Sequence, residues 1–115
     1  MITLPAGMRV LLATKPVDFR KGPHSLAAER LGEDPFSGVV LVFRAKHGDR
    51  VKIVHWDTSG LVLVWKQLEG GAFRWPPITD GTMRLSAVQF AALFAGLDFS
   101  RRENARQIPR PTAAA

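Results

Sequence analysis

The run from Asp34 to Pro76 constrains the fold most, because it divides into short apolar segments separated by turn residues. Segments rich in β-branched and aromatic residues favour strands, and such short links allow only antiparallel neighbours. The predicted strands are Val10 to Ala13, Val39 to Phe43, Val51 to Trp56, Leu61 to Leu68 and Phe73 to Trp75. We therefore expect an α+β fold: a small antiparallel meander of four or five strands, which could close partly into a barrel, with two short helices.

The two helices are predicted from their capping residues. Ser25 can cap a first helix that runs to about Leu31. Ser86 and Gln89 form a capping-box pattern at the start of the second helix. Gly96 follows the last apolar residues at helical spacing and is placed to end that helix.

The turn Asp57-Thr58-Ser59-Gly60 sets the register of the hairpin around it. It fits a type I turn with its glycine left-handed, and this register places Lys52 opposite Lys66. Two lysines directly opposite each other repel, so one interpretation is a phosphate bound between them. The alternative is that their stems lie along Trp56 and Trp75 while the ammonium groups reach water.

Size and composition predict one globular domain over residues 1–100. The chain has 115 residues, 46% of them apolar, which is enough for one core but small for a catalytic nuclease with its own substrate channel. Residues 101–115 contain four arginines against one glutamate and little to bury. This basic tail is predicted to be disordered without a partner.

Several classes of protein are excluded by what the sequence lacks. It contains no cysteine, so disulfides and thiolate metal sites are not expected. It has no apolar run of about 20 residues that could span a membrane. Its first residues lack the apolar segment of a secretory signal, and a cytoplasmic protein is expected.

A search for catalytic groups favours a protein that is not an enzyme. Four acids, Asp34, Asp49, Asp57 and Asp80, stand where turns use their side chains. The three histidines have no close metal-ligand spacing. No catalytic residue, metal or cofactor is therefore predicted.

Cationic residues are the best candidates for a binding site, because the formal net charge is +6 at pH 7 and favours polyanionic partners. The hairpin between the second and third predicted strands carries Arg44, Lys46, His47, Arg50 and Lys52. A two-stranded ribbon can enter the major groove of DNA. A charged hairpin tip also protects strand edges from aggregation, and both interpretations stay open.

A second cationic loop precedes the first helix. Arg20 and Lys21 lie beside Gly22, where a backbone without a Cβ can approach a phosphate. An ordinary solvated loop would look the same. The remaining candidate DNA contacts are Lys66, Arg74, Arg101 and Arg102.

The second helix also offers a candidate protein-binding face. Ala87, Ala91 and Ala95 form a smooth, uncharged surface at helical spacing. Such a face could accept a helix of another protein or of a second copy. It could equally be packed inside this small domain.

Several motifs occur together in an order that resembles a known family. DPFSG, VFR-x-K-H-GDR-x-K, WD-x-x-G-x-x-L, K-x-LE and F-x-WP follow one another along the chain. VDFRKG precedes them, and the helix with its exit Gly-Leu-Asp follows. The ordered set resembles the small TnpB (Orf2-type) accessory proteins of bacterial insertion sequences of the IS66 family, over roughly Met8 to Phe99.

The resemblance implies a role beside a separate transposase that carries the catalysis. The transposase or other proteins of the same element are the partners that this role implies. DNA, contacted mainly through its phosphates, is a partner inferred from the positive charge of the chain. The residues themselves leave two hypotheses: a DNA-binding module, or a protein-interaction module without direct DNA binding. Salt dependence separates them, because phosphate binding weakens steeply with added salt.

Overall fold

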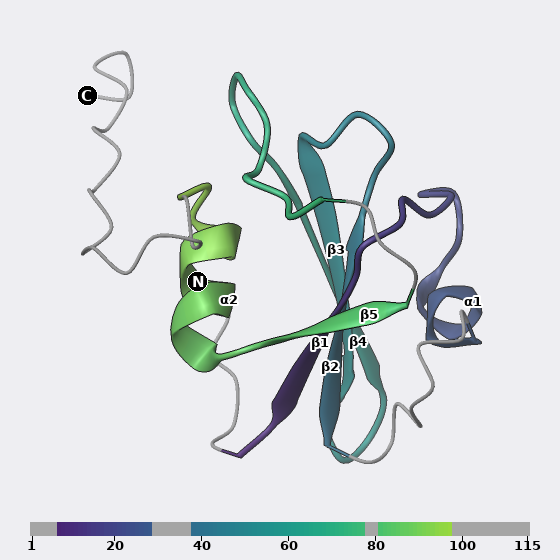
Figure 1. Cartoon of the computed structure of the whole chain (residues 1–115). Helices are drawn as coiled ribbons and strands as arrows, with labels where there is room; N and C mark the ends of the chain where they lie inside the picture. Colours follow the sequence, from purple (N-terminus) through teal and green to yellow (C-terminus); the bar gives the residue numbers. More distant parts are fainter. Residues whose placement is uncertain (1–6, 29–37, 78–80, 98–115) are drawn as a thin grey trace, which may run out of the picture.

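The chain folds around one open five-stranded sheet that carries a short helix on each side (Figure 1). The computed structural model describes residues 7–28, 38–77 and 81–97. The elements, in chain order, are β1 (Arg9–Ala13), α1 (Pro23–Ala28), β2 (Val39–Arg44), β3 (Arg50–Trp56), β4 (Leu61–Gln67), β5 (Thr82–Leu85) and α2 (Ala87–Phe94). The predicted α+β class with two short helices is confirmed. The partly closed barrel is wrong, because the sheet is open in the order β4-β3-β2-β1-β5.

The sheet is mixed, whereas the sequence led us to expect antiparallel neighbours throughout. β1 and β2 run parallel, with Leu11 opposite Leu41, and the other neighbouring strands are antiparallel. The chain passes from β1 to β2 through α1, and a helical crossover of this kind returns the chain to the end where the first strand began.

The fifth strand is also different from the predicted one. Residues 73–75 form no strand, and the Phe73 N–H instead donates to the Gly48 carbonyl at 3.0 Å. The missed strand is β5, which pairs with β1 through Val10 opposite Leu85. The sequence of β5, Thr-Met-Arg-Leu, lacks the β-branched run that marked the other strands.

Both faces of the sheet are covered, and each has its own apolar cluster. Phe90 and Leu93 of α2 pack over one face, and Leu26 of α1 packs over the other. Figure 1 shows the two helices on opposite sides of the sheet. β2 lies between them with residues 39–43 buried, which explains its continuous apolar run in place of an alternating pattern.

The register of β3 and β4 is shifted by one residue from the predicted one. Lys52 lies opposite Trp65, and Lys66 lies opposite Val51. The left-handed residue of the turn is Thr58, with a φ of 86°. Because side chains alternate along a strand, a shift of one residue moves each side chain to the other face. Lys52 and Lys66 therefore lie on opposite faces of the sheet.

Helix α2 has the ends that the sequence predicted. The Ser86 hydroxyl accepts from the Gln89 N–H at 3.1 Å, and the Gln89 side chain accepts from the Ser86 N–H at 2.8 Å. Gly96 has a φ of 79°, and its N–H donates to the Leu93 carbonyl at 2.9 Å. The Leu97 N–H donates to the Ala92 carbonyl at 2.8 Å, which completes a Schellman motif.

Helix α1 begins at Pro23, before the predicted cap at Ser25. Proline suits the first helical position because its fixed φ matches the helix and its missing N–H has no intrahelical partner there. The predicted end near Leu31 and the tail at residues 101–115 lie outside the described residues. In the described part of the chain, no helix is long and apolar enough to cross a membrane.

Candidate nucleic-acid interface

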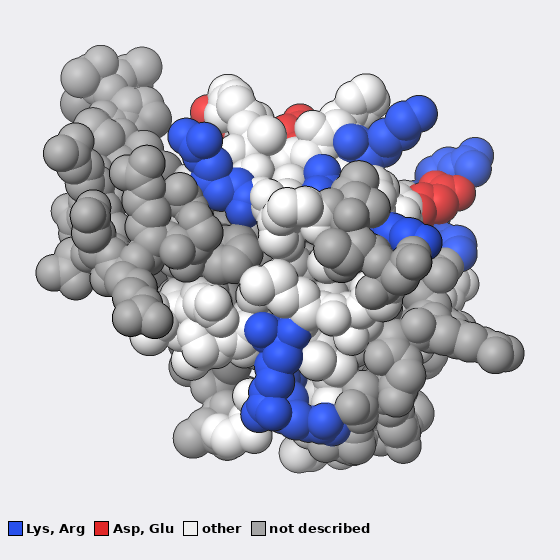
Figure 2. All heavy atoms as spheres, in the orientation of Figure 1, with Lys and Arg blue, Asp and Glu red and all other residues white. Residues whose placement is uncertain are grey.

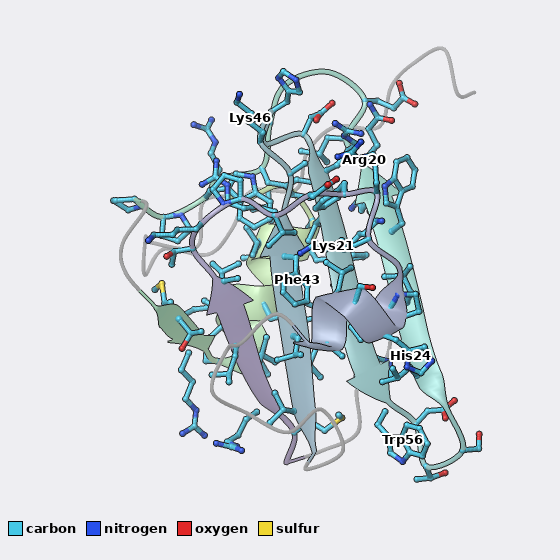
Figure 3. The ribbon with its side chains drawn as sticks, turned by 90° about the vertical axis from the view of Figure 1, so that its right-hand side faces the viewer. Arg20, Lys21, His24, Phe43, Lys46 and Trp56 are labelled. Atoms are coloured by element: carbon cyan, nitrogen blue, oxygen red, sulfur yellow. The ribbon has the colours of Figure 1, made fainter. Side chains whose placement is uncertain are left out.

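Cationic side chains gather at the end of the sheet where β2 and β3 are joined. We call this region the cationic end and define it by Arg20, Lys46, His47, Arg50 and Arg74. All except the half-buried Arg50 are exposed. Blue side chains are prominent at the upper end of the molecule in Figure 2, and Figure 3 places Lys46 and Arg20 there. The fold thus brings together cations from three separate segments.

The β2–β3 connection is held in shape by Trp75, which follows β4. The Trp75 indole N–H donates to the Gly48 carbonyl at 2.8 Å. Gly48 has a φ of 76°, and a Cβ placed there would lie 3.4 Å from two atoms of the Trp75 ring. A residue with a side chain would therefore be strained, and glycine lets the tip carrying Lys46 and His47 close against the ring.

Arg44 also contacts Trp75 and helps to hold it in place. Its guanidinium lies over the Trp75 ring, 5.1 Å from the ring centroid, which is a cation–π distance. The residue is half-buried, and burial lowers the pKa of Arg44 from its ordinary value. Arg44 is therefore placed to stabilise Trp75, and it is less accessible to a phosphate than Lys46.

An open pocket of about 330 Å³ lies between the loop after β1 and the β2–β3 connection. Its lining includes the cations Arg20, Lys46 and Arg50 and the apolar Val17, Phe19 and Ala45, with Asp18 also present. Three cations around an open hollow can bring their donors to one anionic group.

Arg20 is oriented by an acid in its own loop. Its Nε and Nη2 donate to the Asp18 carboxylate at 3.0 and 2.8 Å, while the Arg20 side chain remains 91% exposed. The side-chain hydrogen bonds from Arg20, together with its backbone N–H, hold the pKa of Asp18 well below its usual range. This pairing fixes the guanidinium at the pocket, and the carboxylate reduces the net charge of the pocket.

Arg50 and Asp49 form a looser pair at the start of β3. Arg50 Nε is 3.5 Å from Asp49 Oδ1, and both atoms are buried without a hydrogen-bond partner. The other oxygen of Asp49 accepts from Gln67 Nε2 at 3.1 Å, and this hydrogen bond is the main cause that lowers the pKa of Asp49. The Arg50 guanidinium also lies 5.8 Å from the centroid of Phe19.

Lys52 does not belong to the exposed cations, although the sequence grouped it with them. It is only 8% exposed, and its Nζ donates to the carbonyls of Phe19 and Lys21 at 2.5 and 3.2 Å. Nζ also lies 5.0 Å from the centroid of the Phe19 ring. The ammonium group therefore fastens the loop after β1 to the sheet.

Lys66 has a matching role on the other face. Its Nζ donates to the Phe94 carbonyl, at the end of α2, at 2.5 Å and lies 4.5 Å from the Phe94 ring centroid. A cation at a helix C-terminus is stabilised by the helix dipole. Burial lowers the pKa of Lys66. Neither open interpretation of the two lysines applies: they lie on opposite faces of the sheet, so one phosphate cannot bind both, and their ammonium groups contact protein carbonyls.

The other candidate residues are placed as follows. Lys21 is half-buried, and its carbonyl accepts from Lys52. Arg101 and Arg102 lie outside the described residues. On α2, Ala87, Ala91 and Ala95 are exposed together with Val88, which is 78% exposed. Within the described parts of the chain, this face is left open to solvent.

Residues that act through their neighbours give little signal in the sequence. Asp18 and Phe19 line the pocket, but only the Asp-x-Arg spacing hinted that an acid could hold Arg20. The sequence predicts a strand at Trp75, and no local signal indicates the contact of Trp75 with Gly48. Arg84 is an exposed cation on β5, which could not be placed before that strand was known.

The described residues contain no group of three or more histidine, cysteine, aspartate or glutamate side chains that could hold a metal ion. The site offers positive charge and N–H donors, which are groups that attract anions. It also contains the Phe19 ring, whose contacts are with the cationic Arg50 and Lys52.

Comparison with known proteins places the chain in a family. The family described as IS66 Orf2 like protein matches residues 8–104. The uncharacterized protein y4jC of Sinorhizobium fredii is 43% identical over 118 residues, which cover 100% of both chains. The uncharacterized protein y4hO of the same organism is 37% identical over 101 residues, covering 84% of this chain and 88% of y4hO.

No solved structure matches the chain. The family match spans most of the sequence and includes every described strand and both helices. Among the described residues, Gly7 alone lies outside it. The resemblance seen in the ordered motifs is thereby confirmed. The chain belongs to the IS66 Orf2-like family of insertion-sequence accessory proteins.

Proposed function

We propose that the protein assists transposition of its insertion sequence as a non-catalytic DNA-binding protein in the bacterial cytoplasm. The cationic end is the surface that contacts DNA, mainly through phosphates. The observation that carries this proposal is the convergence of Arg20, Lys46 and Arg50 around one open pocket, with the exposed Arg74 held nearby between Phe73 and Trp75, which both bond to Gly48.

Phosphate contact suits this surface better than base reading. The cations are distributed over a hairpin tip and two loops, so they can follow a backbone, whereas base reading needs donors and acceptors aligned in a groove. Asp18 lines the pocket and Asp49 lies beside Arg50, while Glu69 follows the end of β4 that pairs with Arg50. These acids reduce the net charge of the cationic end. We therefore expect binding with little sequence preference and a marked dependence on salt.

A second candidate function has its own supporting observation. The face of α2 formed by Ala87, Val88, Ala91 and Ala95 is exposed and apolar. Small residues allow another helix to approach closely, so this face suits docking on the transposase or another protein of the element. The two functions use different surfaces and can coexist.

The DNA-binding proposal is tested by titrating duplex DNA at several salt concentrations. Replacing Lys46 and Arg50 with alanine should weaken binding to all duplexes about equally. It should also reduce the slope of log affinity against log salt by roughly 0.9 for each lost phosphate contact. A matched control is Arg84→Ala, which removes an exposed cation from β5 outside the cationic end.

The outcomes separate the two functions. An unchanged affinity and slope for the folded double variant would show that the cationic end does not contact DNA. If the wild-type protein binds no duplex but co-purifies with the transposase, and Val88→Lys abolishes that co-purification, docking through α2 is the function.

A further inference from the structure

The outer edge of β4 is unpaired among residues 7–28, 38–77 and 81–97, because β4 is the last strand on its side of the sheet. The strand is seven residues long, with the sequence LVLVWKQ. It contains no proline, and its pairing with β3 is continuous from Arg50 opposite Gln67 to Trp56 opposite Leu61, without a bulge. Natural edge strands are usually protected by a proline or a β-bulge, and β4 has neither.

Side chains do not protect this edge either. Trp65 is 51% exposed, and Leu61, Val62, Leu63 and Val64 are each only partly buried. The strand's one charged residue is Lys66, and its ammonium group is bonded to the Phe94 carbonyl. A long apolar edge without a free charge is a template for pairing with another strand.

The hydrogen-bond pattern shows which backbone groups face outward. The Leu68 N–H donates to the Asp49 carbonyl at 2.9 Å, and the Asp57 N–H donates to the Gly60 carbonyl at 3.0 Å. Hydrogen-bonded pairs occur at every second residue of an antiparallel ladder. Val62, Val64 and Lys66 therefore bond to β3, and the N–H and C=O groups of residues 61, 63, 65 and 67 point to the free edge.

We propose that this edge pairs antiparallel with β4 of a second copy, to form one continuous sheet across both subunits. The outward-facing groups belong to odd-numbered residues, so these residues must pair with odd-numbered residues of the partner. The register that uses the whole strand is centred on Val64. It pairs Leu61 with the partner's Gln67 and Leu63 with the partner's Trp65, which matches every outward-facing residue with another.

The side chains fit this self-pairing. On the α1 face, Leu63 lies beside the partner's Trp65, and the exposed indole is covered by an aliphatic side chain. On the α2 face, Val64 meets the partner's Val64 and Val62 meets the partner's Lys66. Like charges directly opposite each other would oppose pairing, and this register brings no two like charges together.

The distribution of charge also favours a second copy in this orientation. Gln67 lies opposite Arg50, next to the cationic end, and Leu61 lies at the opposite end of the strand. Antiparallel pairing therefore places the two cationic ends at opposite ends of the joint sheet. The strand spans about 20 Å at roughly 3.3 Å per residue, which exceeds the screening length of about 8 Å at physiological salt.

Single cysteines provide the test, because the chain contains no cysteine. At the centre of the proposed register, Val64 and the partner's Val64 form a non-hydrogen-bonded pair with Cα atoms about 4.5 Å apart, within disulfide range. Val64→Cys should therefore convert almost completely to a disulfide-linked dimer on mild oxidation. The matched control Val62→Cys should not, because its two copies lie about 13 Å apart along the strands.

A second experiment measures the mass of the unmodified protein by analytical ultracentrifugation. The wild-type protein should have the mass of two chains. Trp65→Pro should halve this mass, because proline removes an outward-facing N–H without removing a hydrogen bond to β3. Val88→Lys on α2 should leave the mass unchanged.

Three results would overturn the proposal. They are a wild-type monomer at micromolar concentration, equal cross-linking of the Val62→Cys and Val64→Cys variants, or a dimer lost in Val88→Lys and kept in Trp65→Pro. The cysteine pair keeps the test decisive if the proline variant does not fold. None of these measurements involves DNA, so they stand independently of the proposed function.

Discussion

Lys52 and Lys66 carry the same charge as Lys46, yet they lie in a different environment. The two interior lysines each donate to backbone carbonyls and lie over phenylalanine rings, whereas Lys46 is exposed beside an open pocket. The first two fasten a loop and a helix to opposite faces of the sheet. A count of cations along the sequence therefore overstates the number available to DNA, and the difference between the two groups can be tested.

The largest expected effect on stability comes from removing the Phe90 ring, which anchors α2 to the sheet. Phe90 is 5% exposed and belongs to the core cluster on that face. Phe90→Ala should lower the free energy of unfolding by about 3–5 kcal/mol, a large part of the stability of a domain this small. Urea denaturation measures the loss. An unchanged unfolding midpoint would mean that α2 is not anchored by this face.

The role of the interior lysines is tested by Lys52→Met, which keeps an unbranched side chain and removes the ammonium group. The carbonyls of Phe19 and Lys21 lose their donor, and the free energy of unfolding should fall by about 1–3 kcal/mol. The salt dependence of DNA binding by the folded protein should not change. A stable variant with a reduced salt slope would move Lys52 to the DNA-binding group.

The grouping of these lysines shows what the sequence could and could not predict. Local signals worked: the Ser86 and Gln89 capping box and the Gly96 helix end depend on residues within one or two turns, and both are present. The strand segments of the central hairpin were also found. Register was different, because it depended on a turn whose left-handed residue is Thr58, which its residue type does not favour.

Contacts between residues distant in sequence are the second feature that the sequence does not predict. The parallel pairing of β1 with β2 and the pairing of β5 with β1 connect segments far apart in the chain, and no turn motif signals either. Residues 73–75 have strand-like side chains but bind the β2–β3 connection instead. For the site, Lys46 and Arg20 were predicted as candidates, but their shared pocket depends on this tertiary arrangement.

The shape of the exposed side is tested by Gly48→Ala. A left-handed backbone costs a residue with a Cβ on the order of 1–2 kcal/mol, and the new methyl group would press on Trp75. Stability should fall by about this amount, and DNA affinity should fall with it. Gly81→Ala is the control, since Gly81 also has a positive φ but a Cβ there meets nothing within 4 Å. Equal effects of both substitutions would contradict the proposed fit.

The smallest effect is expected from the pairing of Asp18 with Arg20. The folded-state pKa of Asp18 is depressed, so its contribution to stability is present above its ordinary value of 3.8 and is lost as pH falls below it. Asp18→Asn should therefore reduce the loss of stability on acidification. It should also leave Arg20 unpaired and slightly strengthen DNA binding at low salt. The measurement is the urea midpoint of the wild-type protein and of Asp18→Asn, near neutral pH and below the ordinary pKa of Asp18. An equal loss of stability on acidification in the two proteins would contradict the pairing.

The most direct test compares two double variants that remove the same formal charge, Lys46→Ala with Arg74→Ala and Lys52→Met with Lys66→Met. DNA affinity is measured against salt concentration for each protein, with circular dichroism to confirm the folded state. The exposed pair should reduce the salt slope by up to about 1.8, at roughly 0.9 per lost contact, and the interior pair should leave it unchanged. Equal reductions in slope, or a reduction only in the interior pair, would contradict the assignment of DNA binding to the cationic end.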